Sequence, residues 1–126
     1  MLRTVLAPNA SPLTLAGTRT YIIGRDRAAI IDPGSDLAGH LDAIADTLGE
    51  GALVAILVTH DHPDHIRGAG ALAERLDAPV RRLADGSMKP GDAVETDAGA
   101  LVAVPTPGHT ADHLAFHWPE HRTVFC

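Results

Sequence analysis

Hydrophobic and polar positions along this chain follow two periods, one typical of strands and the other of helices. The short β-rich runs 18–24 ("TRTYIIG") and 28–34 ("AAIIDPG") flank the polar "RDR", which predicts a hairpin. In residues 35–51, leucine and isoleucine recur at helical spacing, between polar residues that can cap the start and glycines that can end it. We therefore expect a helix directly after the hairpin.

Two longer apolar runs come next, and each ends in a polar loop. Residues 52–60 ("ALVAILVTH") form a continuous run rich in β-branched side chains, as in a strand buried on both faces. Pro63 suits the first turn of a helix that residues 64–76 would continue. After a loop-rich stretch at 77–99, residues 100–110 ("ALVAVPTPGHT") predict a second buried strand that ends in a Pro/Gly loop.

The remaining segments complete a layered fold. "HLAFHW" and "RTVFC" predict two final strands around the turn "PEH". This order of elements indicates one α/β domain, of the layered α+β kind, over residues 1–126. A chain of this length can bury about two-thirds of its unfolded surface. The histidine-rich loops fall at the ends of the two most buried strands, where a rigid scaffold can present loop side chains accurately.

Composition excludes several classes of protein. The residues are 45% apolar and 21% charged, unlike a disordered chain or a membrane protein. No apolar stretch approaches the ~20 residues that span a bilayer. The N-terminal apolar run is broken too soon, at Pro8, for a signal peptide. We therefore expect a cytoplasmic protein that does not engage a membrane.

Charge and cysteine usage narrow the chemistry further. A formal net charge of −6 disfavours a broad nucleic-acid surface, which needs a basic patch, but permits a narrow site where a metal meets one phosphate. Cys126 is the only cysteine, which leaves no intrachain disulfide and no cysteine zinc knuckle. Any zinc must therefore be held by carboxylates and by some of the eight histidines.

The stretch "THDHPDH" is the strongest candidate for a metal site. His60 and His62 lie two apart in an extended loop, so both can point toward one ion. The best third ligand is His109 in "TPGHT", at the end of the other apolar strand. Three imidazoles and a water make a catalytic type of zinc site with an open position. Asp64 and His65, at the helix start, could hold a second ion, as in two-metal hydrolysis.

The alternative interpretation is a solvated turn that happens to be rich in histidine. An isolated loop histidine is usually only a loop residue, and we interpret His40, His113, His117 and His121 in that way. We expect His40 on the polar side of the first helix and His121 in a turn. The spaced set in "THDHPDH", with its matching distal histidine, is much harder to explain without a metal.

These motifs resemble those of the metallo-β-lactamase superfamily. "THDHPDH" fits its H-x-H-x-D-H signature, "TPGHT" resembles its third metal motif, and "IIDPG" resembles the aspartate-glycine turn that precedes them. "LADG", "TPGHTADHLAFHW" and "TVFC" look most like the beta-lactamase-like endoribonuclease and glyoxalase II-type branches. The resemblance extends over nearly the whole chain and implies the αββα sandwich of that family.

The resemblance also implies roles for individual residues. The first zinc would be bound by His60, His62 and His109, and the second by Asp64 and His65. Asp32 would lie beneath the site and orient a ligand or its loop; capping the turn at Pro33–Gly34 is an equally good role. The di-iron branch typically has glutamate at the position of His62, so hydrolysis is favoured over oxygen chemistry.

The chain departs from the family pattern in two respects. It ends at Cys126, before the Gly-Asp whose aspartate bridges both metals, before a later histidine, and before the second αβ half. We therefore expect the N-terminal part of the sandwich, with an uncovered sheet surface through which a homodimer could form. The segment "APVRRLADGSMKPGDAV" is also shorter than in most relatives, which leaves the substrate class open.

The expected activity is hydrolysis by metal-activated water, with Asp64 as the base that orients the nucleophile. Esters, thioesters, lactones, β-lactams and phosphodiesters all suit this chemistry. We favour a small ester or thioester over RNA because the acidic chain lacks a basic track. One or two zinc ions are expected, with iron or manganese as alternatives. Two other hypotheses are a catalytically silent metal-binding module and a mononuclear iron oxygenase on the same fold.

Overall fold

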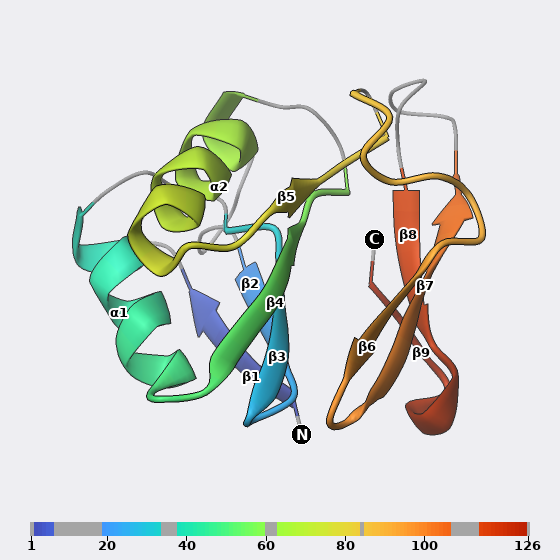
Figure 1. Cartoon of the computed structure of the whole chain (residues 1–126), viewed down its shortest axis with the longest axis horizontal. Coiled ribbons are helices and arrows are strands. Elements are labelled where there is room, and N and C mark those ends of the chain that lie inside the picture. The colour runs from blue at the N-terminus through green and yellow to red at the C-terminus, as the bar shows by residue number, and fades with distance from the viewer. Residues whose placement is uncertain are drawn as a thin grey trace.

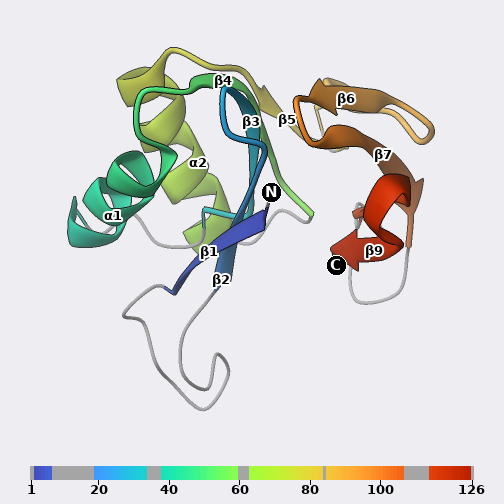
Figure 2. The ribbon, with the colours of Figure 1, turned by 90° about the horizontal axis from the view of Figure 1, so that it is seen from below.

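The computed structural model contains two β-sheets packed face to face, with two helices against the outer face of the first sheet (Figure 1). Seen from below, the layers run from the helices through the first sheet to the second (Figure 2). The structure describes residues 2–6, 19–33, 38–59, 63–83, 85–106 and 114–125. Within that part of the chain, no helix is long and apolar enough to cross a membrane.

The first sheet has the strand order β1-β2-β3-β4-β5. Its strands are β1 (Leu2–Leu6), β2 (Arg19–Ile23), β3 (Arg27–Ile31), β4 (Ala52–Leu57) and β5 (Val80–Arg81). The predicted hairpin is confirmed, since β2 and β3 pair antiparallel. In contrast, β3, β4 and β5 are parallel. The predicted helices connect these parallel strands as α1 (Ala38–Leu48) and α2 (Pro63–Leu76).

Alternation along the central strands divides the core in two. Ile30 and Ile56 lie in the cluster beneath the helices, whereas their neighbours Ile31 and Leu57 lie in the cluster between the sheets. The prediction that β4 is buried on both faces is therefore confirmed over residues 55–58. A strand of this kind gives the loop that follows it a rigid base.

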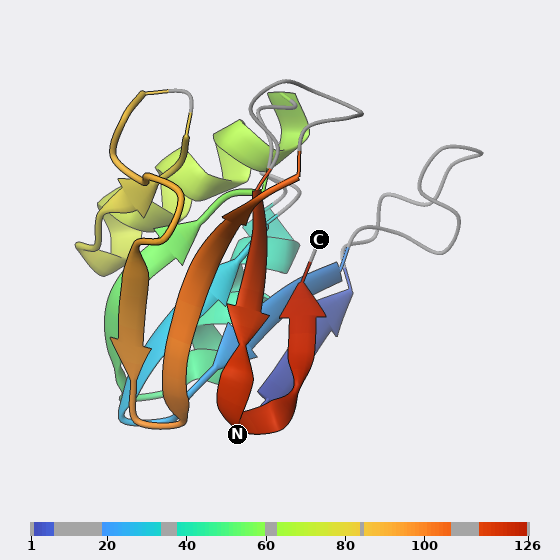
Figure 3. The same cartoon turned by 90° about the vertical axis from the view of Figure 1, so that its right-hand side faces the viewer.

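The second sheet has the order β6-β7-β8-β9 and is antiparallel throughout. Its strands are β6 (Ala93–Thr96), β7 (Gly99–Pro105), β8 (Leu114–Trp118) and β9 (Thr123–Phe125), with a 3-10 turn η1 (Pro119–His121) before the last. The prediction of a fully buried strand at 100–110 is wrong. Leu101 and Ala103 face the core, but Val104 is 39% exposed on the outer face, which no described helix covers (Figure 3).

Three strands were not expected from the sequence. β1 pairs with β2, and its short apolar run was considered only as a possible leader. β5 and β6 lie inside the segment predicted as loop-rich. β5 is only two residues long, and its pairing with β4 depends on the position of α2, which no local pattern encodes.

Candidate metal centre

Two segments carry the predicted ligands, and the elements that flank them end or begin at the same end of the two-sheet stack, at the top of Figure 1. One lies between β4 and α2, and the other lies between β7 and β8. The predicted ligands His60, His62 and His109 lie outside the described residues. Asp64 and His65 fall in the first turn of α2, and their side chains are likewise outside the description.

A hydrogen bond between the sheets brings the two segments together. The backbone N–H of Leu114 donates to the carbonyl oxygen of Thr59 over 2.7 Å. Thr59 directly precedes His60, and Leu114 lies five residues after His109 in the chain. The end of one motif segment is therefore fixed against the start of the other, as a shared metal site would require.

Asp32 fixes the same point from below. It has left-handed backbone geometry, with φ of 52°, and is buried. Its Oδ1 accepts a 2.9 Å hydrogen bond from the Thr59 N–H, and its Oδ2 accepts a 2.7 Å bond from the Thr59 hydroxyl. These contacts hold Thr59, the residue before the motif loop, and the role of Asp32 in orienting that loop stays a prediction. A cap at Gly34 lies outside the described residues.

The expectation that His40 lies on the polar side of the first helix is wrong. His40 is 2% exposed, and its Nε2 lies 3.2 Å from the Thr20 hydroxyl of β2. Burial lowers the pKa of His40 below its ordinary value, because the charged imidazolium would lose its hydration. A sequence signal existed: His40 is four residues before the buried Ile44, so both share one helical face.

The structure also describes two other histidines that we interpret as ordinary residues. His121 is exposed in η1, at the opposite end of the stack, where its ring lies 3.9 Å from the Trp118 ring between centroids. His117 is half-buried on β8. His113 lies outside the described residues. Among the residues that the structure describes, no three His, Cys, Asp or Glu side chains gather in a metal-binding group.

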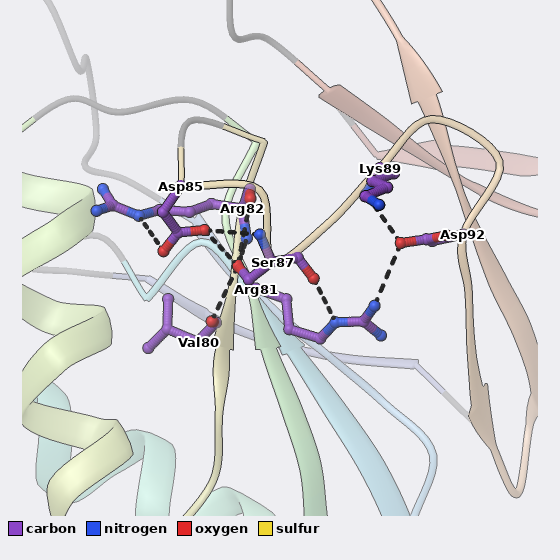
Figure 4. A network of polar contacts seen from close by, with 7 residues as sticks. All are labelled: Val80, Arg81, Arg82, Asp85, Ser87, Lys89 and Asp92. Atoms are coloured by element: carbon purple, nitrogen blue, oxygen red, sulfur yellow. Dashed lines mark hydrogen bonds and ion pairs between the residues drawn. The ribbon is translucent and has the colours of Figure 1, made fainter.

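The short loop between β5 and β6 lies beside the same end of the stack and is ordered by its own polar contacts (Figure 4). The Arg81 guanidinium donates to the Ser87 carbonyl at 3.0 Å and pairs with Asp92 at 3.4 Å. Asp85 accepts hydrogen bonds from the hydroxyl and N–H of Ser87, which lower the pKa of that carboxyl, with a smaller contribution from Arg82.

Beside this loop is a cavity of about 210 Å³ between α2, β4 and β5. Its described lining is Val58, Gly70, Val80, Arg82 and Asp85. Val58 belongs to the apolar cluster beneath the helices, so the cavity lies on the helix side of the first sheet. In the chain, Val58 is two residues before His60. Its size suits a small substituent rather than a whole drug-sized ligand.

Comparison with known proteins agrees with this arrangement. The sequence profile of the Metallo-beta-lactamase superfamily matches residues 13–101. The chain is 34% identical to the Lactamase-like protein aptB of Emericella nidulans and 34% identical to the Atrochrysone carboxyl ACP thioesterase of Aspergillus chevalieri. Each alignment covers 96% of this chain and 42% of the relative, so the chain spans about two fifths of the length of these curated relatives.

Solved structures give the same result for the fold. ETHE1 from Myxococcus xanthus matches with a TM-score of 0.73 and 28% identity, over 94% of this chain and 53% of that one. The BLEG-1 B3 metallo-beta-lactamase matches with a TM-score of 0.74 and 19% identity, over 98% of this chain and 70% of that one. By its profile match, its relatives and its fold, the chain belongs to the metallo-beta-lactamase superfamily.

Proposed function

We propose that this chain carries the metal-binding part of a zinc-dependent hydrolase that acts on an ester or thioester. The observation that carries the proposal is the junction of Thr59 with Asp32 and Leu114. It joins the two segments that hold the histidine motifs at one end of a rigid two-sheet scaffold. Curated relatives that are named as thioesterases support the reaction class.

The donor set fits zinc. In the proposed site His60, His62 and His109 hold the first ion, and Asp64 and His65 contribute to a second. Neutral imidazoles and carboxylates are zinc ligands, and three histidines leave an open position for water. When bound there, zinc would lower the pKa of a coordinated water to about 7 and so supply a nucleophile at neutral pH.

The residues of the chain then divide into two roles. Asp64 would orient the attacking water with its carboxylate and accept its proton, as a general base. Asp32, through its two hydrogen bonds to Thr59, would hold the start of the loop on which His60 and His62 lie. The helical start at Pro63 would fix where Asp64 and His65 leave that loop.

A small thioester is the favoured substrate class. Relatives are named atrochrysone carboxyl ACP thioesterases, so those proteins cleave an acyl group from a carrier protein. The net charge of −6 adds no basic track for RNA, which is therefore less favoured. Because the chain spans about two fifths of those relatives, we extend their activity to it only as a proposal.

Metal analysis combined with a hydrolysis panel tests this function. The zinc-loaded chain is assayed on acyl thioesters, aryl esters, a β-lactam and a phosphodiester, beside His62→Ala and the control His121→Ala. We expect thioester or ester turnover that His62→Ala abolishes and His121→Ala retains. Turnover that survives His62→Ala would refute the proposed site.

A second candidate function is zinc binding without turnover. The same experiment separates the two functions. Zinc bound stoichiometrically, with no hydrolysis of any substrate in the panel, supports the silent module. Bound iron with oxygen consumption would instead support an oxygenase.

A further inference from the structure

Four buried polar residues form a continuous path from the first helix to the motif loop. His40 on α1 contacts Thr20 on β2, Thr20 contacts Asp32 after β3, and Asp32 contacts Thr59 after β4. All four are less than 9% exposed. Buried polar groups are costly unless each is hydrogen-bonded, so apolar residues would be the simpler filling for this space. The path therefore calls for a role beyond packing.

The direction of each hydrogen bond follows from donor chemistry. The carbonyl oxygen of Asp32 has no proton, so the Thr20 hydroxyl must donate the 2.9 Å bond between them. That hydroxyl has one proton, so in its contact with His40 it can only accept, and Nε2 of His40 must be the donor. In the neutral ring Nδ1 is then a bare lone pair, and this buried nitrogen has no hydrogen-bond partner among the residues that the structure describes.

Asp32 needs such support because of its backbone. Its φ of 52° lies in the left-handed region, which residues other than glycine seldom adopt unless neighbouring contacts hold them. The Asp32 N–H donates to the Leu57 carbonyl at 2.9 Å, while Thr20 donates to its carbonyl. With both backbone groups held, the carboxylate can face Thr59 with both oxygens.

We propose that Thr20 and His40 are positioning residues, which hold Asp32 so that its carboxylate fixes Thr59 and the start of the His60–His62 loop for metal binding. This inference rests on the proposed zinc site. Neutral His40 donates a hydrogen bond from Nε2 to the Thr20 hydroxyl. Thr20 in turn donates to the carbonyl oxygen of Asp32, so the two residues together hold the Asp32 backbone.

The test compares variants of near-identical shape. Thr20→Val removes the hydroxyl that connects His40 to Asp32, and Thr20→Ser retains it. His40→Leu removes the Nε2 donor, whereas His40→Gln retains an N–H donor. The control is Thr96→Val, which removes another buried threonine hydroxyl, bonded to the Gly99 carbonyl at 2.7 Å at the opposite end of the stack.

Two readouts are measured on the folded chain. The first is hydrogen exchange of the Thr59 amide without metal, relative to the Ile56 amide of β4, the strand before it. The second is zinc affinity by competition with a chelator. In Thr20→Val and His40→Leu we expect faster relative exchange at Thr59 and zinc affinity about 10–100-fold weaker, the usual range for lost outer-shell support. Thr20→Ser and His40→Gln should recover most of both.

Several results would overturn the inference. One is unchanged exchange and zinc affinity in Thr20→Val, and another is an equal change in Thr96→Val. A third is failure of Thr20→Ser to recover what Thr20→Val loses. If the unsubstituted chain binds no zinc, the proposed metal site fails, while exchange at Thr59 still decides whether Thr20 positions the loop.

Discussion

The two ends of the sheet stack are joined in different ways. At the hairpin end, defined by the turns at 24–26 and 97–98, the Asp97 carboxylate accepts bonds of 2.8 and 3.0 Å from the N–H groups of Arg25 and Asp26. Asp97 is exposed. At the motif end, defined by Asp32, Thr59 and Leu114, the corresponding contacts are buried.

This difference suggests that the hairpin end serves the stability of the fold, whereas the motif end also supports the candidate metal site. The hairpin end joins two tight turns directly, in solvent. Among the described residues of the motif end, the hydrogen bond between Thr59 and Leu114 joins the sheets directly before and after the segments that carry the predicted ligands. Changes at the hairpin end should therefore alter stability alone, and changes at the motif end should alter stability and zinc binding together.

The largest expected effect is that of Asp32→Ala. It leaves the buried N–H and hydroxyl of Thr59 without their carboxylate acceptor, which should cost roughly 3 kcal/mol of unfolding free energy. Zinc affinity should also fall by about 10–100-fold. Urea unfolding and a chelator titration measure the two quantities. The comparison variant Asp97→Ala should destabilise the chain but keep its zinc affinity; a loss of affinity there would break the distinction.

Gly51→Ala should be the next most damaging change. A Cβ at residue 51 would collide with the backbone carbonyl oxygen of Arg25. Because this atom belongs to the backbone of a turn and not to a flexible side chain, it cannot move aside easily. Overpacking of this kind should cost roughly 2 kcal/mol. Thermal unfolding gives the stability, and zinc titration at a temperature where the variant is folded should match the unsubstituted chain. Weakened zinc binding in the folded variant would contradict the account.

The two ends should also respond to different ranges of pH. Because burial lowers the pKa of His40, the unfolded chain binds the additional proton first, so stability declines as pH falls from 6.5 through the folded value. At the hairpin end, hydrogen bonds from the Asp26 and Arg25 amides lower the pKa of Asp97. The stability that this carboxylate contributes is therefore lost only as the pH falls below 3.8.

Urea unfolding as a function of pH tests this separation. His40→Gln should flatten the decline below pH 6.5 and leave the acid limb unchanged, whereas Asp97→Asn should do the reverse. Identical pH profiles for His40→Gln and the unsubstituted chain would show that His40 does not make this contribution.

Gly70→Ala should produce the smallest change, and a favourable one. Gly70 is exposed in the interior of α2, and a Cβ there would meet no atom within 4 Å. Alanine should therefore stabilise the helix by roughly 0.5–1 kcal/mol. A rise in the unfolding midpoint with unchanged zinc affinity is expected. A destabilised variant would mean that the adjoining cavity cannot accept a methyl group.

Much of the fold could be predicted because its signals are local. The hairpin, the helix that starts at Pro63 and the doubly buried β4 each follow from composition or periodicity within one segment. Burial of His40 was available from its spacing to Ile44, but its polarity misled the interpretation. The two-residue β5 carries too little sequence to signal a strand.

The support of the candidate site could not be predicted in the same way. Asp32 and Thr59 are 27 residues apart, and they meet because β3 and β4 pair in a parallel register that shifts between Ala28 and Ala29. Neither residue signals this register by itself. The motif histidines could be named from their spacing, and their metal-binding role stays a prediction.

The central claim is that segments on two different sheets meet to bind one zinc ion. It is tested most directly by zinc titration of the chain with His60→Ala, His109→Ala and the double variant, beside His121→Ala. We predict that each single substitution abolishes high-affinity binding, that the double variant is no worse, and that His121→Ala binds normally. Retention of full zinc affinity by His109→Ala would contradict the claim, because the second sheet would then contribute no ligand.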